Sequence, residues 1–136
     1  MDTEIVIRVL ATGACAVGAW VSLAMLRRTL QADRGLLREP SIVSQPEARL
    51  FFGIPNAGLG IAYYAFMGIA VWRLAHFGLA ALIAASLALA VSVYLSYRLV
   101  TQHLTCRNCW TAHVVNVLII VAVLFLKHHI ARGGTP

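Results

Sequence analysis

Hydrophobic residues fall into four long blocks separated by short polar segments. The blocks cover about residues 5–26, 54–72, 77–97 and 110–126. Each is close to the roughly 20 residues that a helix needs to cross the hydrocarbon core of a bilayer. The pattern predicts one domain over residues 1–132, an all-α integral membrane bundle of four transmembrane helices. Residues 133–136 are predicted to form a disordered tail.

Small residues recur every four positions along two of these blocks. The first block carries such a stripe at Ala14, Gly18 and Ser22. The third block carries a longer one at Ala80, Ala84, Ala88, Ser92 and Ser96. Small residues one turn apart let membrane helices approach each other closely, so each stripe predicts a helix contact.

The polar segment after the first block predicts where helices begin and end. Arg27 and Arg28 are expected to close the first helix, and a short surface helix through Leu30, Leu36 and Leu37 follows. Further along, Ser44-Gln45-Pro46-Glu47 has the pattern of a capping box. It predicts a short interfacial helix over about residues 45–52, stopped at a glycine. With four spans, residues 27–53 and 102–109 lie at the same membrane surface.

Composition and charge support a membrane protein. Of the 136 residues, 60% are hydrophobic and only 12% are charged, too few to cover the surface of a soluble domain of this size. The net charge of +6 raises the question of nucleic acid. However, the basic residues lie at the ends of the apolar blocks, as membrane-flanking charges do, so no nucleic acid partner is expected. Asp2 and Glu4 precede the first block, which predicts a retained helix rather than a cleaved signal.

Cys106 and Cys109 stand three residues apart at the beginning of the fourth block. At this spacing two cysteines share one helical face and can form a disulfide with little movement of the backbone. The free amides and dipole of the helix N-terminus, together with Arg107, stabilise a thiolate on the first cysteine. The pair is therefore predicted to be a redox-active centre that performs thiol–disulfide exchange.

The main alternative is that the two cysteines belong to a metal site. His103, Cys106, Cys109 and His113 follow one another at spacings of three, three and four, so all four could share a face and bind zinc. His113 could also be a structural histidine between helices. The third cysteine, Cys15, lies inside the first block and is expected to be a packing residue.

The chain resembles the vitamin K epoxide reductases and their bacterial homologues over residues 43–124. The resemblance rests on Val43-Ser44-Gln45-Pro46-Glu47-Ala48-Arg49, Phe52-Gly53-Ile54-Pro55-Asn56-Ala57, Gly60, Tyr63, Cys106, Cys109 and His113. It implies a four-helix bundle in the bacterial inner membrane that holds a quinone, ubiquinone or menaquinone, beside the cysteine pair. Members oxidise this pair with quinone from the lipid bilayer and pass the oxidising power to a thioredoxin-like redox protein, which supports disulfide formation.

The resemblance also implies roles for individual residues. Cys109 is the cysteine that faces the quinone, and Cys106 is its exchange partner. Ser44 and Asn56 occupy the places of residues that form hydrogen bonds with the quinone, and His113 matches a position beside the ring. Aromatic walls are expected from Phe51, Phe52, Tyr63 and Trp110. Each has a plain alternative: Ser44 as a helix cap, Asn56 as a partner of local backbone, and the aromatics as an interfacial belt.

One departure from the family pattern concerns the first loop. The family carries a second cysteine pair there, which relays electrons between the partner and the core. This chain has none, and Glu39 stands about where one would fall. A partner's thiols would then have to reach Cys106 directly. The alternative is a non-catalytic subunit or assembly factor of a larger membrane complex.

A second departure concerns orientation. The family's active side faces away from the cytoplasm, which places it in the periplasm. Yet positive charge favours the cytoplasmic side of membrane proteins. The predicted active side here carries seven arginines, Arg27, Arg28, Arg34, Arg38, Arg49, Arg98 and Arg107. The opposite side carries only Arg8, Arg73, Lys127 and Arg132.

Overall fold

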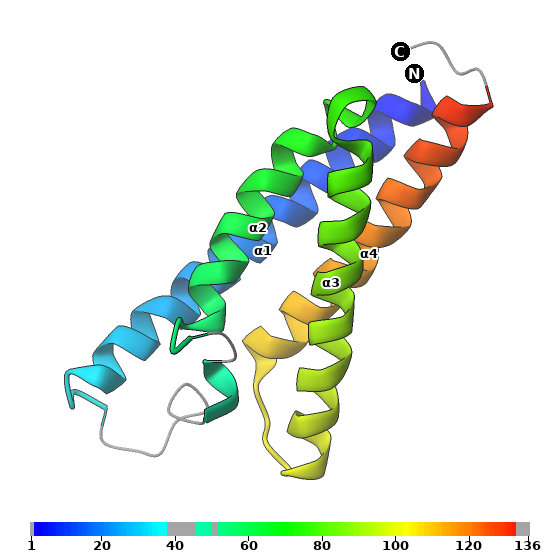
Figure 1. Cartoon of the computed structure of the whole chain (residues 1–136). Coiled ribbons are helices and arrows are strands. Elements are labelled where there is room, and N and C mark those ends of the chain that lie inside the picture. The colour runs from blue at the N-terminus through cyan, green and yellow to red at the C-terminus, as the bar shows by residue number, and fades with distance from the viewer. Residues whose placement is uncertain (1, 38–45, 50–51, 133–136) are drawn as a thin grey trace.

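The computed structural model describes residues 2–37, 46–49 and 52–132, which form helices and no strands (Figure 1). The four α-helices are α1 (Thr3–Asp33), α2 (Asn56–Ala70), α3 (Leu74–Thr101) and α4 (Arg107–Ala131). A short 3-10 helix, η2 (Pro46–Ala48), precedes α2. The all-helical class predicted from the sequence is confirmed.

Three of the helices are long and apolar enough to cross a membrane. They are α1 with 31 residues, α3 with 28 and α4 with 25. The second predicted span is a helix of 15 residues. At about 1.5 Å per residue it is roughly 22 Å long, shorter than a hydrocarbon core of about 30 Å. The chain is thus a helical, multi-pass membrane protein, and a fourth span through α2 stays a prediction.

The helices pack in an open arrangement. Helix α1 packs along both α2 and α4, and α4 also packs along α3, whereas α2 and α3 contact each other much less. The start of α1 and the end of α4 lie at one end of the bundle, and the end of α1, the start of α2 and the connection from α3 to α4 lie at the other (Figure 1). As predicted, the described parts of the polar loop and the start of α4 therefore share one end of the molecule.

Helix α1 does not end at Arg27 and Arg28 but continues to Asp33. The sequence prediction was wrong here because arginine is a good helix former whose long side chain reaches polar surroundings without breaking the helix. The stop comes at Gly35, which has φ +68°. The Gly35 N–H donates to the Ala32 carbonyl and the Leu36 N–H to the Gln31 carbonyl, over 2.9 and 3.0 Å. This pair of bonds is the Schellman ending of a helix.

The predicted interfacial helix over residues 45–52 appears only as η2 in the described part of the loop. Ser44 and the capping box that it was predicted to open lie outside the described residues. The prediction that the helix reaches Phe52 was wrong, because Phe52 and Gly53 form a turn with φ +49° and +77°. The Arg49 guanidinium bonds the Asp33 carboxylate at 2.6 and 2.7 Å and the Gly53 carbonyl at 3.0 Å. This arginine joins the turn before α2 to the end of α1.

Two glycines bring α1 and α2 together. A Cβ on Gly18 would lie 2.5 Å from the Tyr64 ring, and a Cβ on Gly60 would lie 2.7 Å from the Ser22 hydroxyl oxygen. Both distances are shorter than real contacts of a Cβ atom, so only glycine allows the observed approach. The predicted helix contact along the first stripe of small residues thus agrees with the packing of α1 on α2.

Candidate active site

The two cysteines at the start of α4 form a disulfide, with their Cα atoms 5.2 Å apart. Cys106 is the N-cap of α4, and its Sγ accepts a hydrogen bond of 3.2 Å from the Cys109 N–H. Cys106 is half-buried, whereas Cys109 is buried with 8% of its surface exposed. The pair therefore has an outer sulfur and an inner sulfur, which agrees with different roles for the two cysteines.

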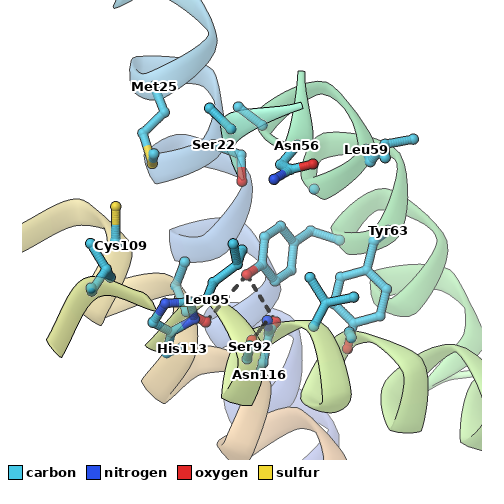
Figure 2. Close-up of a pocket in the computed structure, with 18 of the residues that line it drawn as sticks. Ser22, Met25, Asn56, Leu59, Tyr63, Ser92, Leu95, Cys109, His113 and Asn116 are labelled. Atoms are coloured by element: carbon cyan, nitrogen blue, oxygen red, sulfur yellow. Dashed lines mark hydrogen bonds between the residues drawn. The ribbon is translucent and has the colours of Figure 1, made fainter. Parts of the chain in front are cut away.

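A cavity of about 640 Å³ lies between the four helices at this end of the bundle (Figure 2). Its lining is mostly apolar. Cys109 forms part of its wall, whereas Cys106 does not. The inner cysteine of the pair thus lines a large apolar cavity, and the outer one does not.

The cavity brings together four of the residues that the sequence singled out, Asn56, Tyr63, Cys109 and His113. Asn56 and Tyr63 come from the first turns of α2, and Cys109 and His113 lie one turn apart on α4 (Figure 2). These residues are 46 to 57 positions apart between the two helices, yet they share one cavity because α2 and α4 both pack against α1.

Two of the aromatic residues predicted for this wall, Phe52 and Trp110, are not part of it. The Phe52 side chain is fully exposed, at 101% of its reference surface, in the turn that precedes α2. Trp110 is 45% exposed and contacts His113 edge to face, with ring centroids 6.0 Å apart, from outside the cavity. Ser44 and Phe51 lie outside the described residues.

The structure does not assemble the alternative metal site. His103 is exposed and has φ +52° directly after α3. There the His103 N–H donates to the Val100 carbonyl and the Leu104 N–H to the Leu99 carbonyl, over 3.2 and 3.0 Å, so this residue terminates the helix. Within residues 2–37, 46–49 and 52–132, no three His, Cys, Asp or Glu side chains are grouped to hold a metal ion.

Polar atoms without a partner point to what the cavity can hold. The Tyr63 hydroxyl and both imidazole nitrogens of His113 are buried and form no hydrogen bond with any residue that the structure describes. A buried polar group left unpaired costs about 1–3 kcal/mol, and native proteins keep few of them without a reason. Because both side chains line the cavity, a bound molecule with polar groups on an otherwise apolar body would satisfy them.

A buried hydrogen-bond chain beside the cavity was not predicted. The Tyr64 hydroxyl donates to Asn116 Oδ1 over 2.9 Å, and Asn116 Nδ2 donates to Ser92 Oγ over 2.6 Å. These two hydrogen bonds join α2, α4 and α3. Asn116 is a polar residue inside an apolar helix, a feature that usually marks function or interhelical bonding in membranes and could have revealed it.

Small residues of the stripe on α3 form part of the cavity wall. Ala84, Ala88 and Ser92 line the cavity, and α3 has little contact with α2. Their short side chains leave space open there, while Ser92 also bonds Asn116 of α4. The fully buried alanines of α3 are Ala81 and Ala85, on a neighbouring face.

These features define a helical membrane protein in which one cysteine of a disulfide pair lines an apolar cavity. The family model described as "Vitamin K epoxide reductase family" matches residues 9–124 of the chain. The chain therefore belongs to the vitamin K epoxide reductase family. Comparisons with curated proteins and with solved structures found no match.

Proposed function

We propose that this chain is a membrane thiol oxidoreductase that couples the Cys106–Cys109 pair to the reduction of a quinone, and so supports disulfide formation. The observation that carries the proposal is the position of Cys109 on the wall of an apolar cavity beside polar atoms that lack partners. Membership of the vitamin K epoxide reductase family supports the same chemistry.

A quinone head group fits the cavity in size and in polarity. The volume of about 640 Å³ lies within the roughly 300–1,000 Å³ that is usual for small-molecule sites. Tyr63 can donate a hydrogen bond through its hydroxyl, and His113 through one ring nitrogen. Asn56 lines the same space and carries an amide donor. A quinone, when bound, supplies an acceptor for two electrons and two protons.

The two cysteines have different roles in the proposed reaction. The Cys109 N–H points at Cys106 Sγ, so the helix N-terminus stabilises negative charge on Cys106 in the reduced protein. Cys109 holds its sulfur at the cavity. When the Cys106–Cys109 bond forms, the two thiols release two electrons and two protons, all of which pass to the quinone. His113, one turn from Cys109, is placed to hold a proton on a ring nitrogen during this transfer.

The outer sulfur is the entry point for the partner. A thiolate of a thioredoxin-like protein attacks Cys106 Sγ, which breaks the Cys106–Cys109 bond and leaves a mixed disulfide. The partner's second thiol then displaces Cys106, so the partner leaves with a disulfide and this chain keeps two thiols. Cys106 is half-buried rather than enclosed, and the loop contains no cysteine, so direct attack on Cys106 is the route that we propose.

A trapping experiment tests this route. In Cys109→Ala, the Cys106 thiolate should attack the disulfide of an oxidised thioredoxin-like protein, forming a mixed disulfide and freeing the partner's second thiol. Acid quenching and alkylation of that thiol preserve the adduct, which reductant then releases. The matched variant Cys106→Ala, whose remaining sulfur faces the cavity, should capture none. Equal capture by both variants, or by neither, would remove the proposed entry point.

Turnover tests the coupling to quinone. Purified protein in detergent, with dithiothreitol as the thiol donor, should reduce ubiquinone-1 or a short-chain menaquinone. Cys106→Ala and Cys109→Ala should abolish this activity. Cys15→Ala is the matched control, because Cys15 is buried among helix contacts and does not line the cavity. An inactive wild-type protein that co-purifies with a stable set of membrane subunits would instead favour the role of a non-catalytic subunit.

We also propose that the protein resides in the bacterial inner membrane with its active end in the periplasm. The arginines near that end, among them Arg27, Arg34 and Arg107, favour the opposite orientation. A membrane-impermeant thiol reagent applied to intact spheroplasts after mild reduction decides between the two. Labelling of Cys106 in a Cys15→Ala background supports the periplasmic orientation, and labelling only after lysis supports the cytoplasmic one.

A further inference from the structure

The hydrogen-bond chain beside the cavity ends on Ser92 of α3, a helix on which the sequence predicted no site residue. We infer that the Ser92 hydroxyl donates a hydrogen bond to the molecule bound in the cavity, and that Asn116 and Tyr64 set the direction of this donor. The inference rests on the proposed function and adds a further polar contact for the quinone, on a helix that carries neither cysteine of the pair.

Along this series of hydrogen bonds, the direction of each bond determines the direction of the next. The Tyr64 hydroxyl lies 2.9 Å from Asn116 Oδ1 and 3.4 Å from its other acceptor, the Ala112 carbonyl. The shorter bond goes to Asn116 Oδ1, so the amide nitrogen of Asn116 is the group that faces Ser92. Asn116 Nδ2 then donates to Ser92 Oγ over 2.6 Å. Because Ser92 Oγ accepts this bond, the hydrogen of its own hydroxyl must point to another acceptor.

No residue in the described part of the chain provides that acceptor. Hydroxyl side chains in helices usually donate to the carbonyl one turn back. Four threonines of this chain do so, Thr12, Thr29, Thr101 and Thr111. Ser92 makes no such bond among the described residues, although it is buried, with 4% of its surface exposed, and lines the cavity. Its hydroxyl hydrogen is therefore available to a molecule in the cavity.

The position of Ser92 suits a ligand with acceptors on opposite edges. Asn116, which holds Ser92, follows His113 by three residues, about 4.5 Å further along the helix axis. His113 in turn lies one turn beyond Cys109 (Figure 2). A para-quinone carries carbonyl oxygens on opposite edges of its ring. One carbonyl can meet His113 or Asn56 near the disulfide, while the other meets Ser92 deeper in the bundle.

Binding of ubiquinone-1 to the oxidised protein tests the contact without any turnover. Ser92→Ala should weaken binding in isothermal titration by about 3- to 10-fold, the usual effect of losing one hydrogen bond. Ser92→Thr keeps the hydroxyl and should restore binding. Ser96→Ala is the matched control, because Ser96 lies one turn further along α3 and does not line the cavity. Equal affinities for Ser92→Ala and Ser96→Ala would overturn the inference.

Infrared spectra of the bound quinone give a second readout. In the wild-type protein both carbonyl bands of ubiquinone-1 should lie below the frequency of the free compound. Ser92→Ala should return one band toward that frequency, and Asn116→Leu should do the same by freeing Ser92 to bond its own helix. Unchanged bands in both variants contradict the inference and leave the proposed function standing. Failure of the wild-type protein to bind either ubiquinone-1 or a short-chain menaquinone would refute the proposed function instead.

Discussion

The Tyr64 ring lies directly against the backbone of Gly18, so that a Cβ atom on this glycine would lie 2.5 Å from Cε1 and Cζ of the ring. This contact sets how closely α2 approaches α1. It also holds the Tyr64 hydroxyl where it donates to Asn116 on α4. One glycine thereby supports both the packing of the bundle and the hydrogen-bond chain beside the cavity.

Gly18→Ala should destabilise the protein, because the added methyl group must displace either the Tyr64 ring or a helix backbone. Overpacking of this kind costs about 1–3 kcal/mol in free energy of unfolding. Thermal unfolding in detergent measures the loss. Gly13→Ala is the matched control in the same helix, since its Cβ would meet nothing within 4 Å. If both variants unfold at the same temperature, the proposed constraint at Gly18 is absent.

The two neighbouring tyrosines of α2 should respond in opposite ways to loss of their hydroxyl groups. Tyr63→Phe removes a buried hydroxyl that has no partner, so stability should stay the same or rise, while quinone binding weakens about 3- to 10-fold. Tyr64→Phe leaves Asn116 without its donor and should cost about 1–3 kcal/mol in free energy of unfolding. Unfolding and titration of both variants check the contrast, and the reverse order of stability would contradict it.

The ending of α3 should be improved by a glycine. His103 holds a left-handed conformation, φ +52°, which glycine adopts without strain. His103→Gly is therefore expected to raise the free energy of unfolding by about 0.5–1 kcal/mol, and His103→Ala to give no such gain. Gly35→Ala, at φ +68° with open space around its Cβ, should lower stability by a similar amount. A loss of stability in His103→Gly would indicate that the imidazole makes a stabilising contact.

The class of the protein and the place of its cysteine pair could be predicted from the sequence, because both depend on local signals. Apolar blocks of about 20 residues predict membrane helices wherever the other helices lie. The spacing of Cys106 and Cys109 at a helix start predicts their disulfide for the same reason. The end of α1 was missed because arginines do not stop a helix, whereas Gly35 does.

The cavity could be predicted only in part, because its wall depends on how each helix is rotated. Cys109 and His113 were found because they share a face at helical spacing. Ser92 and Asn116 join across two helices, 24 residues apart, and no local pattern predicts that bond. The sequence predicted Phe52 at the cavity because it stands in the motif shared with the family. In the structure, Phe52 lies in a left-handed turn and its side chain is exposed.

One single-turnover measurement addresses the central claim most directly. Fully reduced protein in a Cys15→Ala background is mixed anaerobically with one equivalent of ubiquinone-1, and quinol and remaining thiols are counted. The account predicts one quinol for each Cys106–Cys109 disulfide formed, and none in Cys109→Ala. Thiols that stay reduced while the quinone remains oxidised would contradict it.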